Sequence, residues 1–413
     1  MIHLCLAKMS ETGAEQKFVQ EAFDTNWVVP LGPNVNGFES DLKTFLGGNG
    51  EMVALSSGTA AVHLALLACG VGAGDEVLVQ SFTFCASVNP IKYLGASPVF
   101  VGSEAGTWNL DPELLEIAIK DRIAKTGKVP KAVVPVALYG MPYDCARVVE
   151  IAGHYGIPVI DEAAEAFGSR FDGRALGTFG KFGVLSFNGN KMITTSGGGA
   201  LFCGNAEDKG KIAWLATQAR DAFPYYQHSE IGYNYRMSNI CAGIGRGQMT
   251  VAQAHIDHHR HVQELYEKWL DGNGICVHRQ PVDKRFDSNF WLTTATLDEN
   301  LKITGQENVY KNLVRSSVGG VAGTLNATGT PTTDCQPNDN VEALRLFLEQ
   351  KQIEVRPVWK PMHKQPVYAG TPIYTNGVEE QIFKRGICLP TGPWVGDDEV
   401  RYIVKCIREA IVL

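Results

Sequence analysis

Residues 158–168 read PVIDEAAEAFG and residues 183–199 read GVLSFNGNKMITTSGGG, and these two stretches decide the fold. Each begins with a short apolar run, typical of a buried strand, that ends directly in polar residues. Acids follow the first run, and Lys191 follows the second among amides, hydroxyls and glycines. Because polar groups at strand ends meet at one edge of an α/β sheet, the two stretches predict a shared binding site.

The chain on both sides of these stretches alternates apolar runs with amphipathic segments. Short strands separated by helices need crossovers, which favours a mostly parallel sheet with helices on both faces. The expected strands are 52–55, 76–80, 98–101, 132–137, 158–160, 183–187 and 200–203, and the expected helices are 59–68, 112–123 and 146–154.

A smaller α/β region is expected after one long helix over residues 250–271, because the strand pattern changes there. Its expected elements are strands at 291–296 and 354–358 and helices near 341–351 and 397–411. Residues 318–340, rich in Gly, Thr, Asn and Pro, are expected to form a surface loop. The predicted division is an N-terminal segment (1–35), a large domain (36–250), and a connector helix with a small C-terminal domain (251–413).

Composition limits the class of protein. The 413 residues are 45% hydrophobic and 20% charged, enough for a sizeable core. A net charge of −7 without a basic block argues against a nucleic-acid partner. The ten cysteines occur singly, without a CxxC pair, which favours reduced thiols over a zinc or disulfide scaffold. Without a signal peptide or a run of ~18 apolar residues, we expect a cytoplasmic protein that does not bind membranes.

The segment SSGTAA, residues 56–61, follows the first expected strand and opens a helix. Small residues there let the backbone approach an anion, and a helix N-terminus offers free N–H groups and a positive dipole. An ordinary capped turn has the same composition, so the segment alone leaves both interpretations open. The chain contains no GxGxxG or GxxxxGK[ST] motif, which disfavours a dinucleotide or P-loop site.

Lys191 is the candidate nucleophile. Partial burial at a strand end disfavours the ammonium form of a lysine and frees the amine that forms a Schiff base, whereas a solvent-facing lysine in a turn is the alternative. A pyridoxal ring also needs an acid beside its nitrogen, and the acids after Ile160 could supply it. Strand alternation allows only one of the neighbours Asp161 and Glu162 to face such a ring.

An ordered series of motifs now resembles the DegT/DnrJ/EryC1/StrS sugar aminotransferases: SSGTAA, SFTF, LYGMP, VIDEAAEAFGS, SFNGNK, GYNYRMSN and RPVWKPMH. The resemblance runs from about residue 15 to the C-terminus, apart from residues 318–340. It implies an α/β protein with the aspartate aminotransferase fold (fold type I), in which a large mostly parallel sheet domain precedes a smaller C-terminal α/β domain. It also implies pyridoxal 5'-phosphate as cofactor.

Within the family the chain looks most like the branch that acts on UDP-linked 4-keto-6-deoxy-N-acetylhexosamines in bacterial glycan synthesis. That resemblance implies transfer of an amino group from glutamate to C4 of the nucleotide sugar, in a homodimer. Lys191 would carry the cofactor covalently and move the proton. Further cofactor contacts are implied for Ser57, Gly58, Thr59, Phe84, Glu162, Glu165, Ser186, Asn188 and, from the neighbouring subunit, Asn234. Substrate contacts are implied for Arg236, Trp359, Lys360 and His363.

Three positions depart from the usual family pattern. Glu162 stands where Asp is usual beside the ring nitrogen, so either the ring shifts or Asp161 takes the role. Ala137 stands in place of a common His, and Gly102 in place of a common Asp. None of these changes removes the lysine.

Other interpretations are disfavoured by particular residues. Related sugar dehydratases of this fold carry His where Lys191 stands, and a non-catalytic PLP- or sugar-binding relative would not need that lysine. Four histidines crowd one expected helix (His255, His258, His259 and His261), and the i, i+4 spacing of His255 and His259 could bind a metal. Without an HExxH pattern, a solvated helix face is the expectation, and no metal is expected.

Overall fold

The computed structural model describes residues 1–309 and 335–412. Its main feature is a sheet built of two four-stranded parts, ordered β14-β3-β2-β4 and β5-β8-β9-β1. Parallel bridges from Val133 to Val159 and from Val136 to Glu162 join β4 to β5, so the two parts continue one another. The strands are β1 (Glu51–Leu55), β2 (Glu76–Gln80), β3 (Ser97–Val101), β4 (Ala132–Val134), β5 (Ile160–Glu162), β8 (Phe182–Ser186), β9 (Gly199–Cys203) and β14 (Ile373–Tyr374).

The sheet is mostly parallel, as the sequence predicts. Strands β14, β3, β2 and β4 pair in parallel, and so do β5 and β8, whereas β9 is antiparallel to both β8 and β1. Strand β14 comes from the C-terminal part of the chain and extends the edge of a sheet otherwise made by residues 51–203. The expected strands lie within a few residues of the observed ones.

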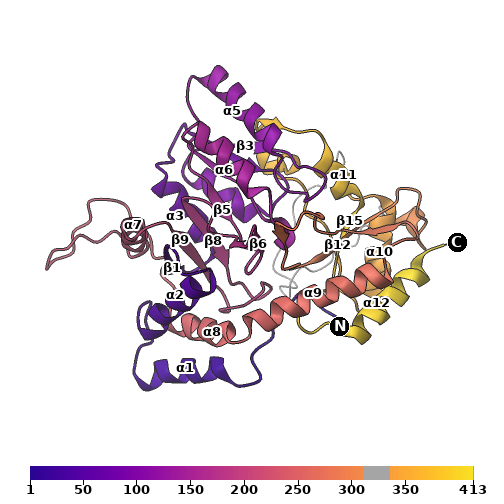
Figure 1. Ribbon diagram of the computed structural model, residues 1–413, viewed down its shortest axis with the longest axis horizontal. Helices are drawn as coiled ribbons and strands as arrows, with labels where there is room; N and C mark the ends of the chain where they lie inside the picture. The colour runs from indigo at the N-terminus through magenta and orange to yellow at the C-terminus, as the bar shows by residue number, and fades with distance from the viewer. Residues whose placement is uncertain (310–334, 413) are drawn as a thin grey trace.

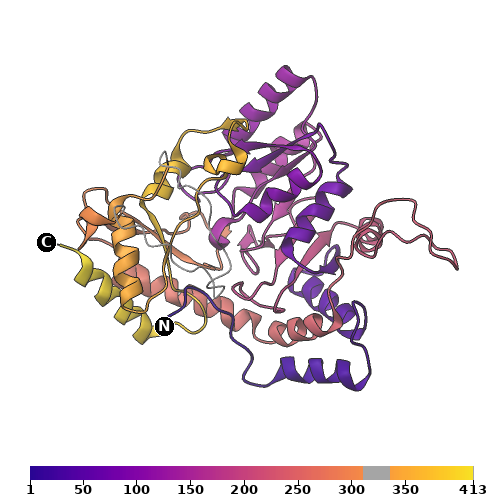
Figure 2. The same cartoon turned by 180° about the vertical axis from the view of Figure 1, so that it is seen from behind.

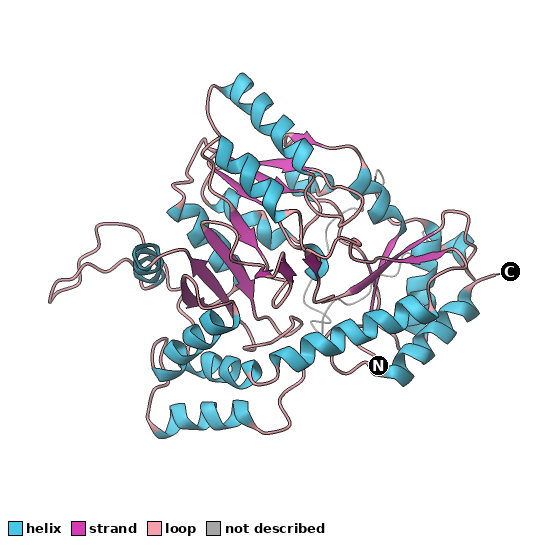
Figure 3. Cartoon of the chain, viewed as in Figure 1, coloured by secondary structure: helices cyan, strands magenta, loops and turns pink. Residues whose placement is uncertain are grey.

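Helices cover both faces of this sheet (Figures 1 and 3). Alternate residues of β1 enter different cores, because Met52 and Ala54 pack in one apolar cluster and Val53 and Leu55 in another. The helices of this part are α1 (Ala14–Asp24), α2 (Pro33–Phe45), α3 (Gly58–Ala68), α4 (Asn89–Tyr93), α5 (Pro112–Thr126), α6 (Cys145–His154), α7 (Ala206–Ala216) and α8 (Asn239–Met249).

The long helix expected over 250–271 is confirmed with narrower bounds, as α9 (Ala252–Trp269). Helix α8 ends just before it, at Met249. Thr250 closes α8 by donating its hydroxyl to the carbonyl of Gly247, and Val251 lies outside both helices. In Figures 1 and 2, α9 runs from below the large sheet to the second sheet, so it connects the two parts.

The second sheet is antiparallel and packs on its own apolar core. Its order is β10-β12-β15-β13, with β10 (Ile275–Val277), β12 (Thr293–Leu297), β13 (Arg356–Pro357) and β15 (Gly386–Leu389). Helices α10 (Asp339–Gln350), α11 (Val378–Arg385) and α12 (Asp397–Ala410) accompany it, and a small sheet joins β6 (Arg170–Phe171), β7 (Arg174–Ala175) and β11 (Phe286–Asp287). The predicted domain limits stay a prediction.

Two further expectations meet the structure here. The loop expected over 318–340 lies mostly outside the described residues, and at its end Asp339 and Asn340 already belong to α10. No helix in residues 1–309 or 335–412 is both long and apolar enough to cross a bilayer.

Candidate active site

A cavity of about 350 Å³ lies at the ends of β5 and β8. That volume lies at the lower end of the usual range for small-molecule sites. The residues predicted from the sequence that line it are Ser57, Gly58, Thr59, Phe84, Glu162, Glu165, Ser186, Asn188, Lys191 and Trp359. The two stretches that open the sequence analysis therefore do meet in one site.

The N-terminus of α3 forms one wall of this cavity. The Ser57 hydroxyl caps the helix by accepting a hydrogen bond from the Ala60 N–H at 3.0 Å. A side chain at position 58 would be crowded, because a Cβ on Gly58 would lie 3.0 Å from the Cβ of Ser186. The N–H groups of the first helical turn have no partner within the helix, so this wall suits an anion such as a phosphate.

Lys191 lies between a carboxylate and an aromatic ring. Its ammonium nitrogen is 3.3 Å from Oε1 of Glu165 and 4.0 Å from the ring centroid of Trp291. Only 14% of its side chain is exposed. The other oxygen of Glu165 accepts the backbone N–H of Tyr139 at 2.8 Å, which fixes the carboxylate. The alternative of a solvent-facing lysine in a turn is therefore wrong.

Asp161 and Glu162 are both buried within β5 rather than after it, because the strand continues to pair with β8 at Gly183 and Val184. Asp161 accepts hydrogen bonds from the Tyr143 hydroxyl and from the backbone N–H groups of Gly177 and Phe179. Burial raises the pKa of Asp161, and these donors oppose the rise. Asp161 therefore holds the loop after β7 and is not among the residues that line the cavity.

Glu162 faces the cavity with few donors of its own. Its carboxylate accepts one hydrogen bond, from the Ala164 N–H at 3.3 Å. Burial raises the pKa of Glu162 to about 8; the nearby Glu165 carboxylate adds to the rise, and Lys191 opposes it. This carboxyl is able to hold a proton near neutral pH. A cationic ligand, or one that shares the proton in a hydrogen bond, would stabilise it in the cavity.

The residues present fit pyridoxal phosphate. The α3 N-terminus and Ser186 can hold the phosphate, Glu162 offers the acid that the pyridine nitrogen requires, and Lys191 offers the amine. Phe84, with 52% of its surface exposed, stands at the cavity with its ring 5.8 Å from that of Trp359, where it can contact the flat ring.

The predicted substrate residues do not all reach the cavity. Trp359 lines it, and its buried indole N–H has no hydrogen-bond partner within the described part of the chain. His363 instead contacts the Ser81 hydroxyl at 2.7 Å and Glu380 at 3.1 Å. Lys360 is half-buried beside Trp359 and is not among the lining residues.

Arg236 also lies outside the cavity lining. Its guanidinium pairs with the buried Glu39 at 2.7 Å and donates to the carbonyl of Ala54 at 3.1 Å. These contacts join α2 to β1, so the guanidinium is used within the fold. Asn234, two residues earlier, is exposed.

The structure shows what surrounds two of the residues that depart from the family pattern, Gly102 and Ala137. A Cβ at Gly102 would lie 3.0 Å from Thr375 and 3.1 Å from a carboxylate oxygen of the buried Glu379, which leaves little room for Asp. Glu379 instead accepts the N–H of Ser103 at 3.2 Å. Ala137 is fully buried, and its N–H donates to the carbonyl of Glu162 at 3.0 Å.

The histidines of α9 serve different partners. His255 and His259 are buried against the carbonyls of Met192 and Phe290, so the expected solvated face is wrong for these two. His258 contacts the carbonyl of Val395, and His261 pairs with Asp397. Among the described residues, no group of three or more His, Cys, Asp or Glu side chains is arranged to hold a metal.

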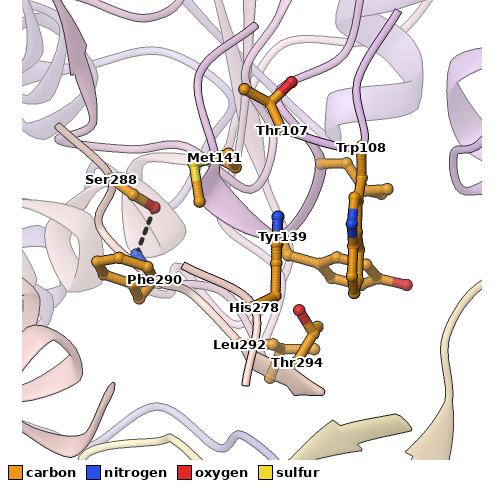
Figure 4. A pocket seen from close by; sticks show the side chains of 10 residues that line it. Thr107, Trp108, Tyr139, Met141, His278, Ser288, Phe290, Leu292 and Thr294 are labelled. Carbon is orange, nitrogen blue, oxygen red and sulfur yellow. Dashed lines mark hydrogen bonds between the residues drawn. The ribbon is translucent and has the colours of Figure 1, made fainter. Parts of the chain in front are cut away.

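A second cavity, shown in Figure 4, is too small for a substrate. Its volume of about 10 Å³ holds one water at most. The ring of His278 stacks on Trp108 at 3.9 Å, and burial lowers the pKa of His278 to about 3, so this imidazole is neutral. The Ser288 hydroxyl accepts the Phe290 N–H beside it. The cavity lined by Lys191, Glu162 and Glu165 is the candidate active site because of these side chains.

Sequence reasoning missed Trp291 and Tyr139. Residues 291–296 are predicted as a strand, with no role assigned to Trp291, but β12 begins at Thr293 and Trp291 lines the cavity. Tyr139 has a left-handed backbone (φ 55°), which aims its N–H at Glu165. Its side-chain hydroxyl accepts the N–H of Trp359 at 2.8 Å.

Comparisons with known proteins identify the family and the fold of the chain. The model of the DegT/DnrJ/EryC1/StrS aminotransferase family matches residues 9–322 and 325–408. EpsN of Bacillus subtilis, named as a candidate pyridoxal phosphate-dependent aminotransferase, is 41% identical over 96% of this chain and 92% of its own. GDP-perosamine synthase of Escherichia coli O157:H7 is 34% identical over 99% of both chains. The crystal structure of a family member from Brucella abortus, 24% identical, superposes with a TM-score of 0.81 over 96% of this chain and 95% of its own.

The chain therefore belongs to the DegT/DnrJ/EryC1/StrS aminotransferase family. It has the fold of the pyridoxal-phosphate enzymes of fold type I and is a pyridoxal-phosphate-dependent aminotransferase.

We expect Glu162→Gln to stabilise the cofactor-free protein increasingly as the pH rises from about 5 to about 8. Above pH 4.5 the unfolded chain loses this proton while the folded chain keeps it, so the wild type loses ~1.4 kcal/mol of unfolding free energy per pH unit in that interval. Urea unfolding at several pH values measures the difference. Glu230→Gln, at an exposed carboxyl, is the control, and a pH-independent difference for Glu162→Gln would contradict the assignment.

We expect Arg236→Met to destabilise the protein without changing the Michaelis constant for the acceptor. Loss of the guanidinium leaves the buried Glu39 carboxylate with the Lys209 ammonium and the Ala54 N–H as partners. Removal of one partner of a buried pair costs about 3–5 kcal/mol of unfolding free energy, and the remaining partners should reduce that loss. Thermal unfolding should show that Glu39→Gln restores part of this loss in the double variant. A raised Michaelis constant for the acceptor in a stable variant would show that Arg236 does contact the substrate.

Proposed function

We propose that this enzyme transfers an amino group from glutamate to C4 of a nucleotide-linked 4-keto-6-deoxyhexose. The observation that carries the proposal is the meeting of the Lys191 amine, the buried Glu162 carboxyl and the α3 N-terminus in one cavity. The product would be an amino sugar for surface glycan or polysaccharide synthesis in the bacterial cytoplasm.

The cofactor, when bound, supplies the electron sink that stabilises negative charge on the substrate carbon during proton transfer. The residues of the chain have separate tasks around it. Lys191 carries the cofactor and then moves the proton between substrate carbon and cofactor. Glu165 holds the lysine amine at 3.3 Å, and Glu162 holds a proton where the pyridine nitrogen needs one. The α3 N-terminus binds the phosphate.

Two features support a nucleotide sugar as acceptor. Phe84 and Trp359 form aromatic walls at the cavity, which suit the apolar face of a sugar, and the unpartnered Trp359 N–H offers a donor for a sugar oxygen. In addition, the name of the Escherichia coli relative states an amino sugar carried on GDP. The sequence suggests a UDP-linked N-acetylhexosamine for this chain, so the two nucleotides are the acceptors to compare.

We expect the purified protein to aminate at least one member of a panel of UDP-, GDP- and dTDP-linked 4-keto-6-deoxy sugars, with release of 2-oxoglutarate from glutamate. Mass spectrometry and NMR of the product identify the acceptor and the carbon that carries the amine. Lys191→Ala should abolish turnover, and borohydride reduction of the holoenzyme should fix the cofactor on Lys191 in a peptide map. A sugar that is dehydrated rather than aminated would favour the dehydratase alternative, and binding without turnover would favour a regulatory relative.

We propose in addition that the active unit is a homodimer with composite sites. Residues 220–231, the outer part of the loop between α7 and α8, extend away from the rest of the chain (Figures 1 and 2). This arm exposes the large apolar side chains of Phe223, Tyr225, Tyr226 and Ile231. Asn234 lies at the base of the arm and is exposed. A second copy that covers the arm would bury these side chains, and Asn234 would then reach the phosphate of the partner's cofactor.

Mixed dimers of Lys191→Ala and Asn234→Ala should regain part of the activity that each variant lacks. In such a dimer one site carries both lesions and the other carries neither. Subunits are dissociated, mixed and reassociated, and mixed dimers are verified by native mass spectrometry with a mass tag on one variant. Self-mixing of each variant is the control. Zero activity in verified mixed dimers would show that Asn234 acts within its own chain.

A further inference from the structure

Trp291 presents a ring face to the Lys191 amine inside the cavity. The nitrogen lies 4.0 Å from the ring centroid, close enough for a cation–π interaction. The same nitrogen is 3.3 Å from Oε1 of Glu165. Because the lysine side chain is only 14% exposed, these two groups replace much of the water that would otherwise surround the ammonium.

The Trp291 ring is held in place. It is 2% exposed, and its indole N–H donates to the carbonyl of Asn190, the residue before the lysine, at 2.7 Å. Its backbone N–H donates to the side-chain oxygen of Asn289 at 2.8 Å. The Asn289 amide in turn donates to the carbonyls of Glu165 and Phe167, each at 3.0 Å. One asparagine therefore joins the backbone of Trp291 to the backbone of the segment that carries Glu165.

We infer that the face of Trp291 and the Glu165 carboxylate form a resting site for the protonated Lys191 amine while it is not bonded to the cofactor. This inference rests on the proposed attachment of the cofactor to Lys191. When the lysine nitrogen bonds to the aldehyde carbon of pyridoxal phosphate, one water leaves and the nitrogen leaves the ring face. When pyridoxamine phosphate is bound instead, the corresponding carbon already carries an amino group. Lys191 therefore cannot bond to it, and the lysine amine stays in the resting site.

The resting site therefore stabilises the cofactor-free enzyme and its pyridoxamine phosphate complex, and not the complex in which the lysine is bonded. Removal of the ring should favour pyridoxal phosphate over pyridoxamine phosphate. If Trp291 were only a wall of the cavity, its removal would weaken both cofactor forms alike. The ratio of the two dissociation constants separates these roles.

The experiment measures the affinity of the full-length cofactor-free protein for each of the two cofactor forms, by fluorescence titration and equilibrium dialysis. We expect Trp291→Leu to shift the affinity ratio toward pyridoxal phosphate by roughly 2- to 30-fold, the range of a partly desolvated cation–π contact. Trp291→Phe, with a weaker ring face, should shift the ratio in the same direction by less. The Phe variant alone decides the point if the Leu variant does not fold.

Lys191→Met is the matched background. It cannot bond to either cofactor, so Trp291→Leu in this background should leave the ratio unchanged. An unchanged ratio in both Trp291 variants with intact lysine would overturn the resting site, as would an equal shift in the Lys191→Met background. Borohydride mapping on the wild type keeps the two proposals apart. An adduct on another lysine defeats the proposed attachment, whereas an adduct on Lys191 with an unchanged ratio defeats only the resting site.

Discussion

Two consecutive residues of β5 carry buried carboxyl groups, and the chemistry of the cavity depends on which hydrogen-bond donors satisfy each carboxyl. Asp161 is satisfied inside the protein, because a hydroxyl and two backbone N–H groups donate to it. From the described residues, Glu162 receives a single hydrogen bond, at 3.3 Å, and it faces the cavity. A buried carboxyl with so few donors is stabilised either by keeping its proton or by pairing with a cation. Asp161 therefore holds a loop of the fold in place, whereas the carboxyl of Glu162 is available to a ligand.

Close packing between segments brings the other side chains of the site near Glu162. Gly140 has φ +91°, and a Cβ there would collide with the Asn289 side chain, so only glycine lets Asn289 come near. Asn289 can then bind the carbonyls of Glu165 and Phe167 while it accepts the N–H of Trp291. The left-handed Tyr139 next to Gly140 aims its own N–H at Glu165. The position of the Lys191 amine is therefore set by several segments that are distant in sequence.

The sequence predicts the parts of the site that local patterns encode. Strand ends and a capped helix start predict that Lys191, the pair of Asp161 and Glu162, and the α3 N-terminus lie near one edge of the sheet. The choice of Glu162 over Asp161 and the role of the helix start come from the resemblance to the family. Trp291 could not be found in this way, because it lies in the loop before β12 and its place in the cavity depends on tertiary contacts. Arg236 and His363 show the opposite case, since each lies in a motif of the family but contacts an internal carboxylate, Glu39 or Glu380.

The division of the site between segments has a consequence for how specificity can vary. The α3 N-terminus, Glu162 and Lys191, which are proposed to hold the cofactor, all come from residues 57–191, at the ends of the large sheet. The aromatic walls Trp291 and Trp359 come from residues after α9, and the backbone N–H of Trp359 is tied to the large sheet's side of the cavity by the Tyr139 hydroxyl. On the proposed function, changes near Trp359 would therefore reshape the side of the cavity that faces the acceptor, while the groups proposed to hold the cofactor stay in place. Trp291 differs, because its ring touches the lysine itself, so a change there alters the chemistry as well as the shape of the cavity.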